Sequence, residues 1–193
     1  AYSWLKAPRY DGEPMEVGPA ARMVVAYLRG HSRVRSELDR ALREAGLGLR
    51  DLNSTVGRHL ARAVECKVVA HKLLEYVNEL QPGAPFHTPF AIPKEASGMG
   101  LTEAPRGALG HWITIRNSRI ASYQCVVPTT WNASPRDDRG KLGPMERALL
   151  GAPVGDPKAP IEPARVVRSF DPCIACAVHL LEGGRQLAAL RVC

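Results

Sequence analysis

Two cysteines and a histidine stand close together near the end of the chain. Cys173 and Cys176 are separated by two residues, and His179 follows after two more. Thiols at this spacing can bind one metal atom or oxidise together. A thioredoxin-like redox site needs a βαβ setting that the preceding sequence lacks. Tetrahedral zinc needs four ligands, and the sequence has no second C-x-x-C pair. The spacing favours metal binding, ahead of redox chemistry and a purely structural role. Thiolates favour nickel, zinc, copper or iron–sulfur over magnesium or calcium.

The other three cysteines, Cys66, Cys125 and Cys193, stand alone in the sequence. A total of five is odd and does not suit a closed disulfide framework. We expect Cys66 to lie in a helix and Cys125 in a strand, both buried as small hydrophobic residues. Chemistry is therefore expected at the C-terminal pair.

A basic stretch is the second chemical feature of the sequence. The net charge is +7, and between Arg22 and Lys72 there are 11 Lys or Arg against 5 Asp or Glu. A basic stripe can bind nucleic acid. Stacking on bases, however, requires aromatic side chains among the charges, and this stretch contains only Tyr27. We expect no nucleic-acid partner, and instead a solvated face or an acidic protein partner.

The composition is that of an ordinary globular chain. Of the 193 residues, 45% are hydrophobic and 23% charged, which excludes a disordered or collagen-like protein. The longest apolar runs fall far short of the roughly 20 residues that a membrane-spanning helix requires. No signal peptide is recognisable at the N-terminus.

The first part of the chain, up to about residue 80, is predicted to be helical. Only three of the sixteen prolines precede residue 81. Helices are predicted over 13–29, 31–45 and 53–80, from their apolar spacing and from start and stop residues. The third helix would be about 40 Å long at roughly 1.5 Å per residue, which suits a scaffold element of a larger body.

The second part of the chain is predicted to be built from strands, turns and irregular segments. A hairpin is predicted over 112–127, turning at Asn117 and Ser118. A short helix is expected within 135–150 and an extended run over 164–170. Helices first and strands later predict an α+β fold, mainly helical, with a long scaffold helix and a small antiparallel hairpin region.

The sequence around the cysteine pair, D-P-C-I-A-C-A-V-H over 171–179, resembles the C-terminal signature of the nickel–iron hydrogenase large subunit. Four other segments resemble the same family in the same order, namely Y-S-W-L-K-A-P-R (2–9), E-P-M-E-V-G-P (13–19), E-A-P-R-G (103–107) and Y-Q-C-V-V-P-T-T-W-N (123–132). The resemblance covers essentially the whole chain but only the C-terminal part of that family. The family's N-terminal R-x-C-x-x-C ligand pair and its glutamate proton gate are missing.

The resemblance implies roles for the two cysteines. In such hydrogenases four thiolates hold nickel, and two of them bridge to an iron that carries carbon monoxide and cyanide. Cys173 would be a terminal nickel ligand and Cys176 a bridging one. A coordinating thiol is deprotonated by the metal charge. The terminal thiolate of Cys173 is then a plausible proton acceptor when hydrogen is split.

The E-A-P-R-G segment carries a second implied group. Arg106 corresponds to the arginine that the family places over the open metal position. A guanidinium keeps its proton and is a poor base, so its role would be electrostatic and that of a hydrogen-bond donor to cyanide. Asp171 would pair with Arg106 and orient it, and Pro105 would complete the canopy. Thr129 corresponds to the family's hydroxyl donor to the other cyanide.

The resemblance also implies a magnesium ion and a processing step. His179 and the backbone carbonyl of Cys125 would bind magnesium near the cluster. A dedicated endopeptidase would cut directly after His179. The implied organisation is a helical part (1–80), a hairpin and irregular part (81–170), the metal-binding motif (171–179) and a removable C-terminal extension (180–193).

The sequence is therefore interpreted as the C-terminal part of a nickel–iron hydrogenase large subunit, inactive without its N-terminal half and small subunit. Implied partners are a small subunit with iron–sulfur clusters, the missing N-terminal half, the endopeptidase and nickel-insertion proteins. Arg22, Arg29 and their basic neighbours are expected to face such a partner. The closest resemblance is to membrane-associated uptake enzymes on the periplasmic side of the cytoplasmic membrane. Two alternatives are a non-catalytic scaffold subunit of a related redox complex and a stand-alone zinc or redox C-x-x-C module.

Overall fold

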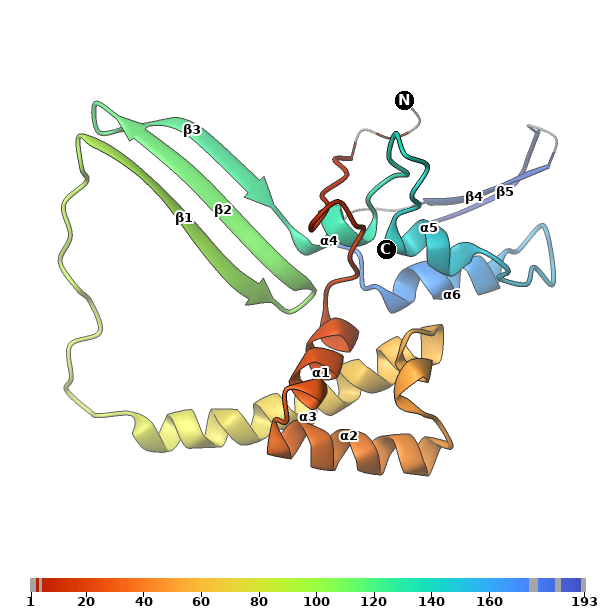
Figure 1. Cartoon of the computed structure of the whole chain (residues 1–193), viewed down its shortest axis with the longest axis horizontal. Helices are drawn as coiled ribbons and strands as arrows, with labels where there is room; N and C mark the ends of the chain where they lie inside the picture. The colour runs from red at the N-terminus through yellow and green to blue at the C-terminus, as the bar shows by residue number, and fades with distance from the viewer. Residues whose placement is uncertain (1–2, 4, 174–176, 183–184, 192–193) are drawn as a thin grey trace.

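The structure is a computed structural model that describes residues 3, 5–173, 177–182 and 185–191, with side chains described up to residue 173. Its first half is helical and its second half holds two antiparallel sheets and three short helices (Figure 1). The elements in chain order are α1 (Pro19–Leu28), α2 (Ser32–Ala45), the 3-10 helix η1 (Leu49–Leu52), α3 (Thr55–Glu79), β1 (Glu95–Ala104), β2 (Gly107–Arg116), β3 (Arg119–Val126), α4 (Pro128–Asn132), α5 (Pro144–Leu149), α6 (Ile161–Ser169), β4 (Ala177–Glu182) and β5 (Arg185–Arg191).

The main apolar core lies between α1, α2 and α3. In α2, three buried residues recur every four positions, which places them on one face of the helix: Val34, Leu38 and Leu42. Ala61 and Val64 of α3 complete this core. None of the described helices is both long and apolar enough to cross a membrane.

The long helix α3 confirms the predicted scaffold. Ser54 caps its first turn by accepting a hydrogen bond from the backbone N–H of Gly57 at 3.0 Å. Gly57 is required there, because a Cβ at this position would lie 2.1 Å from the backbone oxygen of Asp51. The prediction that Cys66 is buried is wrong, since its side chain is exposed. Cys66 follows the buried Val64 by two residues and therefore points to roughly the opposite side of the helix, at about 100° per residue.

The predicted hairpin is confirmed, but it belongs to a three-stranded sheet in the order β1–β2–β3. Asn117 and Ser118 form the β2–β3 turn, both with positive φ, which matches the twist of two-residue hairpin turns. The sequence did not predict β1, because Gly98 and Gly100 interrupt it and it has few β-branched residues. It forms because β2 offers its free edge over ten paired positions.

One predicted helix start and one predicted extended segment are wrong. The first helix begins at Pro19 rather than near residue 13, because the chain before it is extended and the Asn132 side chain binds both the N–H and the C=O of Val17, at 2.9 and 2.8 Å. The run over 164–170 is helical rather than extended. There Val167 and Phe170, three positions apart, bury one face of α6 against Met145 of α5.

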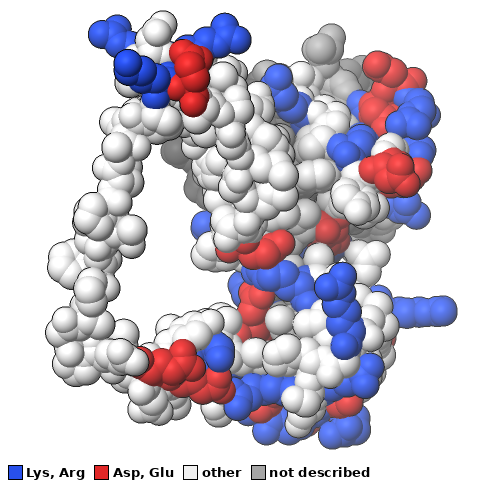
Figure 2. Space-filling view, turned by 60° about the vertical axis from the view of Figure 1, so that its left-hand side comes forward, with Lys and Arg blue, Asp and Glu red and all other residues white. Residues whose placement is uncertain are grey.

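The segment between α3 and β1, residues 80–94, runs as an exposed connection along the outside of the molecule. Phe86 and Phe90 are fully or largely exposed in it. Figure 2 shows this segment standing apart from the rest of the chain, with open space between. The remaining sheet, β4–β5, is a hairpin on the side of the molecule away from β1–β3 (Figure 1).

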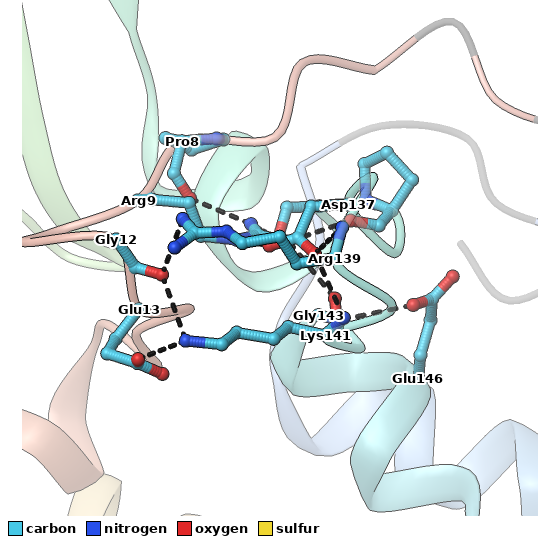
Figure 3. A network of polar contacts seen from close by, with 11 residues as sticks. Pro8, Arg9, Gly12, Glu13, Asp137, Arg139, Lys141, Gly143 and Glu146 are labelled. Atoms are coloured by element: carbon cyan, nitrogen blue, oxygen red, sulfur yellow. Dashed lines mark hydrogen bonds and ion pairs between the residues drawn. The ribbon is translucent and has the colours of Figure 1, made fainter.

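The N-terminal segment is fastened to the loop that follows α4 (Figure 3). Arg9 donates to the Asp137 carboxylate at 2.9 Å and to the backbone oxygens of Pro135 and Lys141 at 3.1 and 3.3 Å. The pKa of Asp137 is lowered, first by the backbone N–H of Lys141 and further by Arg9 and the N–H of Arg139. This network fixes the segment around Arg9 against residues 135–141 of the loop that follows α4.

Candidate metal centre

Cys173 is held by a single hydroxyl group. Its backbone N–H and its Sγ both lie 3.1 Å from Oγ1 of Thr129. Thr129 stands in the first turn of α4, which Pro128 begins with a φ already suited to a helix, and only 3% of it is exposed. Cys173 itself is exposed and unpaired. The thiol therefore has one fixed side and one side open to a ligand.

Arg106 contacts Asp171, which precedes Cys173 by two residues in the sequence. The Nε group of Arg106 donates to the backbone oxygen of Asp171 at 2.8 Å and lies 3.2 Å from its carboxylate oxygen. Asp171 has a φ of 50°, in the left-handed region, where the chain turns out of α6 towards Cys173. Both contacts use Nε, so among the described contacts the terminal Nη groups of Arg106 stay available as donors to a ligand.

The structure thus brings together four predicted site residues from three separate segments. Arg106 comes from the β1–β2 turn, Thr129 from α4, and Asp171 and Cys173 from the chain after α6. Pro105 lies next to Arg106, and its carbonyl accepts a hydrogen bond from Arg22 at 2.7 Å. The pairing predicted between Asp171 and Arg106 is confirmed.

The E-A-P-R-G segment (103–107), called here the EAPRG loop, is held tightly against α1. A Cβ on Gly18 would lie 2.9 Å from the backbone oxygen of Arg106. Gly107 has a φ of 136°, and a Cβ there would lie 2.6 Å from Val17. These two glycines let the backbones approach to a distance that any side chain would prevent.

Three charged residues in this region were not singled out as site residues from the sequence. Arg22, expected to face a partner chain, pairs with Glu65 and Glu103 of the same chain, and 20% of its side chain is exposed. Burial by itself would lower the pKa of Arg22, but its bonds to Glu65 and Glu103 outweigh this and raise the pKa. Arg58 and Arg62 of α3 contact the chain near Asp171 instead, with Arg58 stacked over the Phe170 ring at 4.0 Å and Arg62 donating to the Ser169 carbonyl at 2.9 Å. The sequence signal was available, because 58, 62 and 65 share one helix face.

The remaining predicted site residues lie partly outside the described region. Cys176 is outside the described residues, and for His179 only the backbone is described, in β4 opposite Ala189 of β5. Cys125 is confirmed in β3 and is half-buried, close before α4. Among the residues with described side chains, no three His, Cys, Asp or Glu groups gather as a metal site. The described donor is one soft sulfur, which fits nickel or another thiophilic metal only when further thiolates join it.

Comparisons with known proteins identify the family of the chain. A family model described as nickel-dependent hydrogenase matches residues 1–179. The uptake hydrogenase large subunit of Bradyrhizobium diazoefficiens is 45% identical over 203 residues, covering 99% of this chain and 34% of the relative. The hydrogenase-1 large chain of Escherichia coli K12 is 45% identical over 202 residues, with the same coverage.

Solved structures of the same kind superimpose on the chain. The reduced Ni-Fe-Se hydrogenase from D. vulgaris Hildenborough matches with a TM-score of 0.78 and 41% identity, over 90% of this chain and 37% of that one. The H2-activated [NiFeSe]-hydrogenase of Dm. baculatum matches with a TM-score of 0.76 and 46% identity, over 90% and 36%. The chain spans about a third of the length of the curated relatives it matches.

Proposed function

The chain belongs to the nickel-dependent hydrogenase family, and from this premise we propose that it is the C-terminal part of a large subunit that catalyses the reversible oxidation of H2 to protons and electrons. One observation carries the proposal. An exposed thiol, Cys173, is held by a buried hydroxyl next to an oriented arginine–carboxylate pair, within the region that the family model matches.

The proposed centre is a nickel–iron pair whose iron carries carbon monoxide and cyanide. Cys173 and Cys176 would supply two of its four thiolate ligands. When bound, this pair supplies the redox-active site at which H2 is split. The other two thiolates come from the N-terminal part of the large subunit, so residues 1–193 alone are expected to be inactive. Half a ligand set binds a metal weakly.

Cys173 is the proposed proton acceptor. As a terminal ligand it has lone pairs left for a proton, and its open side is the exposed one. The Cys173 thiol donates to Oγ1 of Thr129 at 3.1 Å, and this contact orients Sγ. The backbone N–H of Cys173 binds the same oxygen, so one hydroxyl positions both the backbone and the sulfur of this residue.

Arg106 acts as an electrostatic group rather than as a base. Its charge is permanent, and its Nε is bound to both the carbonyl and the carboxylate of Asp171, which fixes the plane of the guanidinium. A donor oriented before the reaction costs no reorganisation during it. The Nη groups are proposed to donate to one cyanide and Thr129 to contact the other, with Pro105 shielding the same side.

Two further proposals concern the end of the chain. The side chain of His179 and the carbonyl of Cys125 are assigned to a magnesium ion near the cluster. Residues 180–193 are assigned to an extension that an endopeptidase removes after His179 once nickel is bound. The family model supports this boundary, since its match ends at residue 179. The mass of the large subunit in active enzyme tests it: a C-terminus at His179 supports removal, and active enzyme that still ends at Cys193 contradicts it.

The proposed partners follow from the same family. They are a small subunit with iron–sulfur clusters that takes the electrons, the N-terminal part of the large subunit, and the proteins that insert nickel and process the chain. We also propose, from the resemblance to membrane-associated uptake enzymes, a place on the periplasmic side of the cytoplasmic membrane, reached together with the small subunit. No step of the proposed reaction uses nucleic acid.

The test of the proposed function is the metal content and hydrogen uptake of the assembled enzyme carrying Cys173→Ser. We expect it to lose nickel and at least about 10³-fold of the activity, because a hydroxyl replaces a soft thiolate ligand. Cys66→Ser is the matched control, since Cys66 is an exposed thiol on α3 and should change neither quantity. Full nickel and turnover in Cys173→Ser would contradict the proposal. Zinc in place of nickel in the wild-type protein would favour the zinc-module alternative.

A further inference from the structure

We propose that Arg22 is a positioning residue that sets the place of Arg106, and that one face of α3 fixes the spacing of the two segments that meet in the Arg106–Asp171 pair. This inference rests on the proposed function only in giving Arg106 a role in the reaction. Arg22 itself acts through the EAPRG loop and is assigned no contact with substrate or metal.

The five N–H groups of the Arg22 guanidinium match five contacts. On one side, Nε and Nη2 donate to the two carboxylate oxygens of Glu65 in α3, at 2.5 and 2.8 Å. On the other side, Nη1 donates to the Glu103 carboxylate at 2.6 Å and to the carbonyl of Ala104 at 2.9 Å. The last donor, on Nη2, binds the carbonyl of Pro105 at 2.7 Å. A guanidinium has five N–H donors, so this count uses all of them.

Three consecutive residues of the EAPRG loop are therefore bound directly before Arg106. The Glu103 side chain and the carbonyls of Ala104 and Pro105 leave little freedom to the peptide bond that enters Arg106. On the other side of Arg106, Gly107 packs against Val17 and the Arg106 carbonyl packs against Gly18. The residues before Arg106 are held by Arg22 of α1, and Arg106 and Gly107 pack against the two residues that directly precede α1, so a movement of this part of the chain relative to the loop moves Arg106.

The partner of Arg106 is positioned by the same helix, α3. Arg58 lies over the ring of Phe170 and is bound by both carboxylate oxygens of Glu16 at 2.8 Å, which leaves it only 4% exposed. Arg62 donates to the carbonyl of Ser169 at 2.9 Å. These contacts fix the chain immediately before Asp171.

The positions of the three α3 residues explain how one element holds both segments. Arg58, Arg62 and Glu65 follow the spacing i, i+4, i+7 and so share a face. They span roughly 10 Å along the axis, at about 1.5 Å per residue. Arg58 and Arg62 hold the segment with Asp171, while Glu65 holds Arg22 and through it the segment with Arg106. The helix thus acts as a rigid spacer between the two halves of the pair.

A lysine cannot replace Arg22 in this arrangement. It has three donors on one nitrogen and no planar fork, so it cannot bind the Glu65 carboxylate and the loop carbonyls together. The apolar core of α1, α2 and α3 does not depend on Arg22, because it is formed by side chains such as Met23, Leu38 and Ala61. A variant at Arg22 should therefore fold and bind nickel while the EAPRG loop moves.

The experiment compares Arg22→Lys, Arg106→Lys and the double variant in the assembled enzyme, with Arg33→Ala as control. Arg33 forms an exposed ion pair with Glu75 of α3, away from the loop. Because a displacement of about 1 Å in a reacting group can cost about 10²-fold in rate, we expect Arg22→Lys to lower turnover 10- to 100-fold with nickel retained. The double variant should be no slower than Arg106→Lys alone, because both changes act through one group. Arg33→Ala should behave as wild type.

A second readout needs no metal and no turnover. In the metal-free large subunit, amide hydrogen exchange of residues 103–107 should become at least about tenfold faster in Arg22→Lys, with unchanged exchange in α2. Unchanged exchange in the loop, or losses that multiply in the double variant, would overturn the positioning role. If Arg106→Lys itself leaves turnover unchanged, the role proposed for Arg106 fails, whereas the exchange result still decides whether Arg22 holds the loop.

Discussion

The two tight turns of the three-stranded sheet are formed in different ways. The β2–β3 turn consists of Asn117 and Ser118, both exposed and both with positive φ. Its two backbone N–H groups donate to the Glu95 carboxylate at 3.0 Å and to the Lys94 carbonyl at 3.1 Å, but its conformation is one that its own residues favour. The β1–β2 turn carries Arg106, and it is shaped by residues distant in the sequence, namely Gly18, Arg22 and through it Glu65. A turn whose conformation its own residues favour can keep that conformation when neighbouring elements change. A turn defined by tertiary contacts can place a functional side chain with accuracy, and it depends on every element that holds it.

The largest effect expected at the held turn comes from Arg106→Lys. We expect a loss of turnover of about 10²-fold or more with nickel content unchanged, because lysine retains the charge but not the oriented fork beside Asp171. Hydrogen uptake and metal analysis of the assembled enzyme measure both. The matched control is Arg119→Lys at the other turn, which should retain full activity. Loss of nickel in Arg106→Lys, or near-full activity, would show that the assigned role is wrong.

The next effect concerns the stability of the two turns. Gly107→Ala introduces a Cβ that would lie 2.6 Å from Val17 and 2.7 Å from the backbone nitrogen of Gly18, at a φ of 136°. We expect a destabilisation of about 2–4 kcal/mol from strain and overpacking together. Gly98→Ala, in the same sheet with nothing within 4 Å, is the control and should be neutral or slightly stabilising. The thermal midpoints of the large subunit decide; equal midpoints would mean that α1 does not constrain the loop.

A smaller effect is expected at the locally defined turn. Asn117→Val should destabilise the protein by about 1 kcal/mol, since a β-branched residue is disfavoured at positive φ. Asn117→Gly should be close to neutral, because glycine adopts this conformation readily. Neither change should alter hydrogen uptake, because the turn lies about 30 Å along β2 from the turn with Arg106, at roughly 3.3 Å per residue. Urea unfolding and activity assays check the pair, and an activity loss would contradict a local role.

The smallest expected effect is on the pH dependence of stability at Asp137, which has contacts from nearby in the sequence and one from a distant residue. Its pKa is lowered in the folded protein, chiefly by the N–H of Lys141 nearby and further by the distant Arg9. A lowered folded-state pKa means that the stabilisation is fully present well above the ordinary value of 3.8 and is lost as the pH falls through the lowered pKa. The stability difference between wild type and Asp137→Asn should thus stay constant above about pH 5 and shrink below about pH 4. Urea midpoints across this range measure it, with Arg9→Ala retaining part of the acid dependence. A difference that grows on acidification would reverse the assigned sign.

Local patterns were enough to predict part of the fold. The helices over 31–45 and 53–80 and the turn at Asn117 each depend on neighbours in the sequence, and the structure confirms them. The α-helical nature of 161–169 was not predictable in this way. Its valines favour a strand locally, and only the packing of Val167 and Phe170 against Met145 makes the helix stable.

By itself, the sequence determined which chemical groups are present and the order in which they occur. The cysteine motif, the E-A-P-R-G segment and the hydroxyl of Thr129 are readable because each is a short run of residues with its own chemistry. Only the tertiary structure decided that Thr129 binds Cys173, that Arg106 binds Asp171, and that Arg22 binds Glu65. These contacts and that of Arg22 with Pro105 join residues 43 to 83 positions apart in the chain. Pairings over such separations arise only when the packing of α1 and α3 brings both partners together, so no local pattern in the sequence contains them.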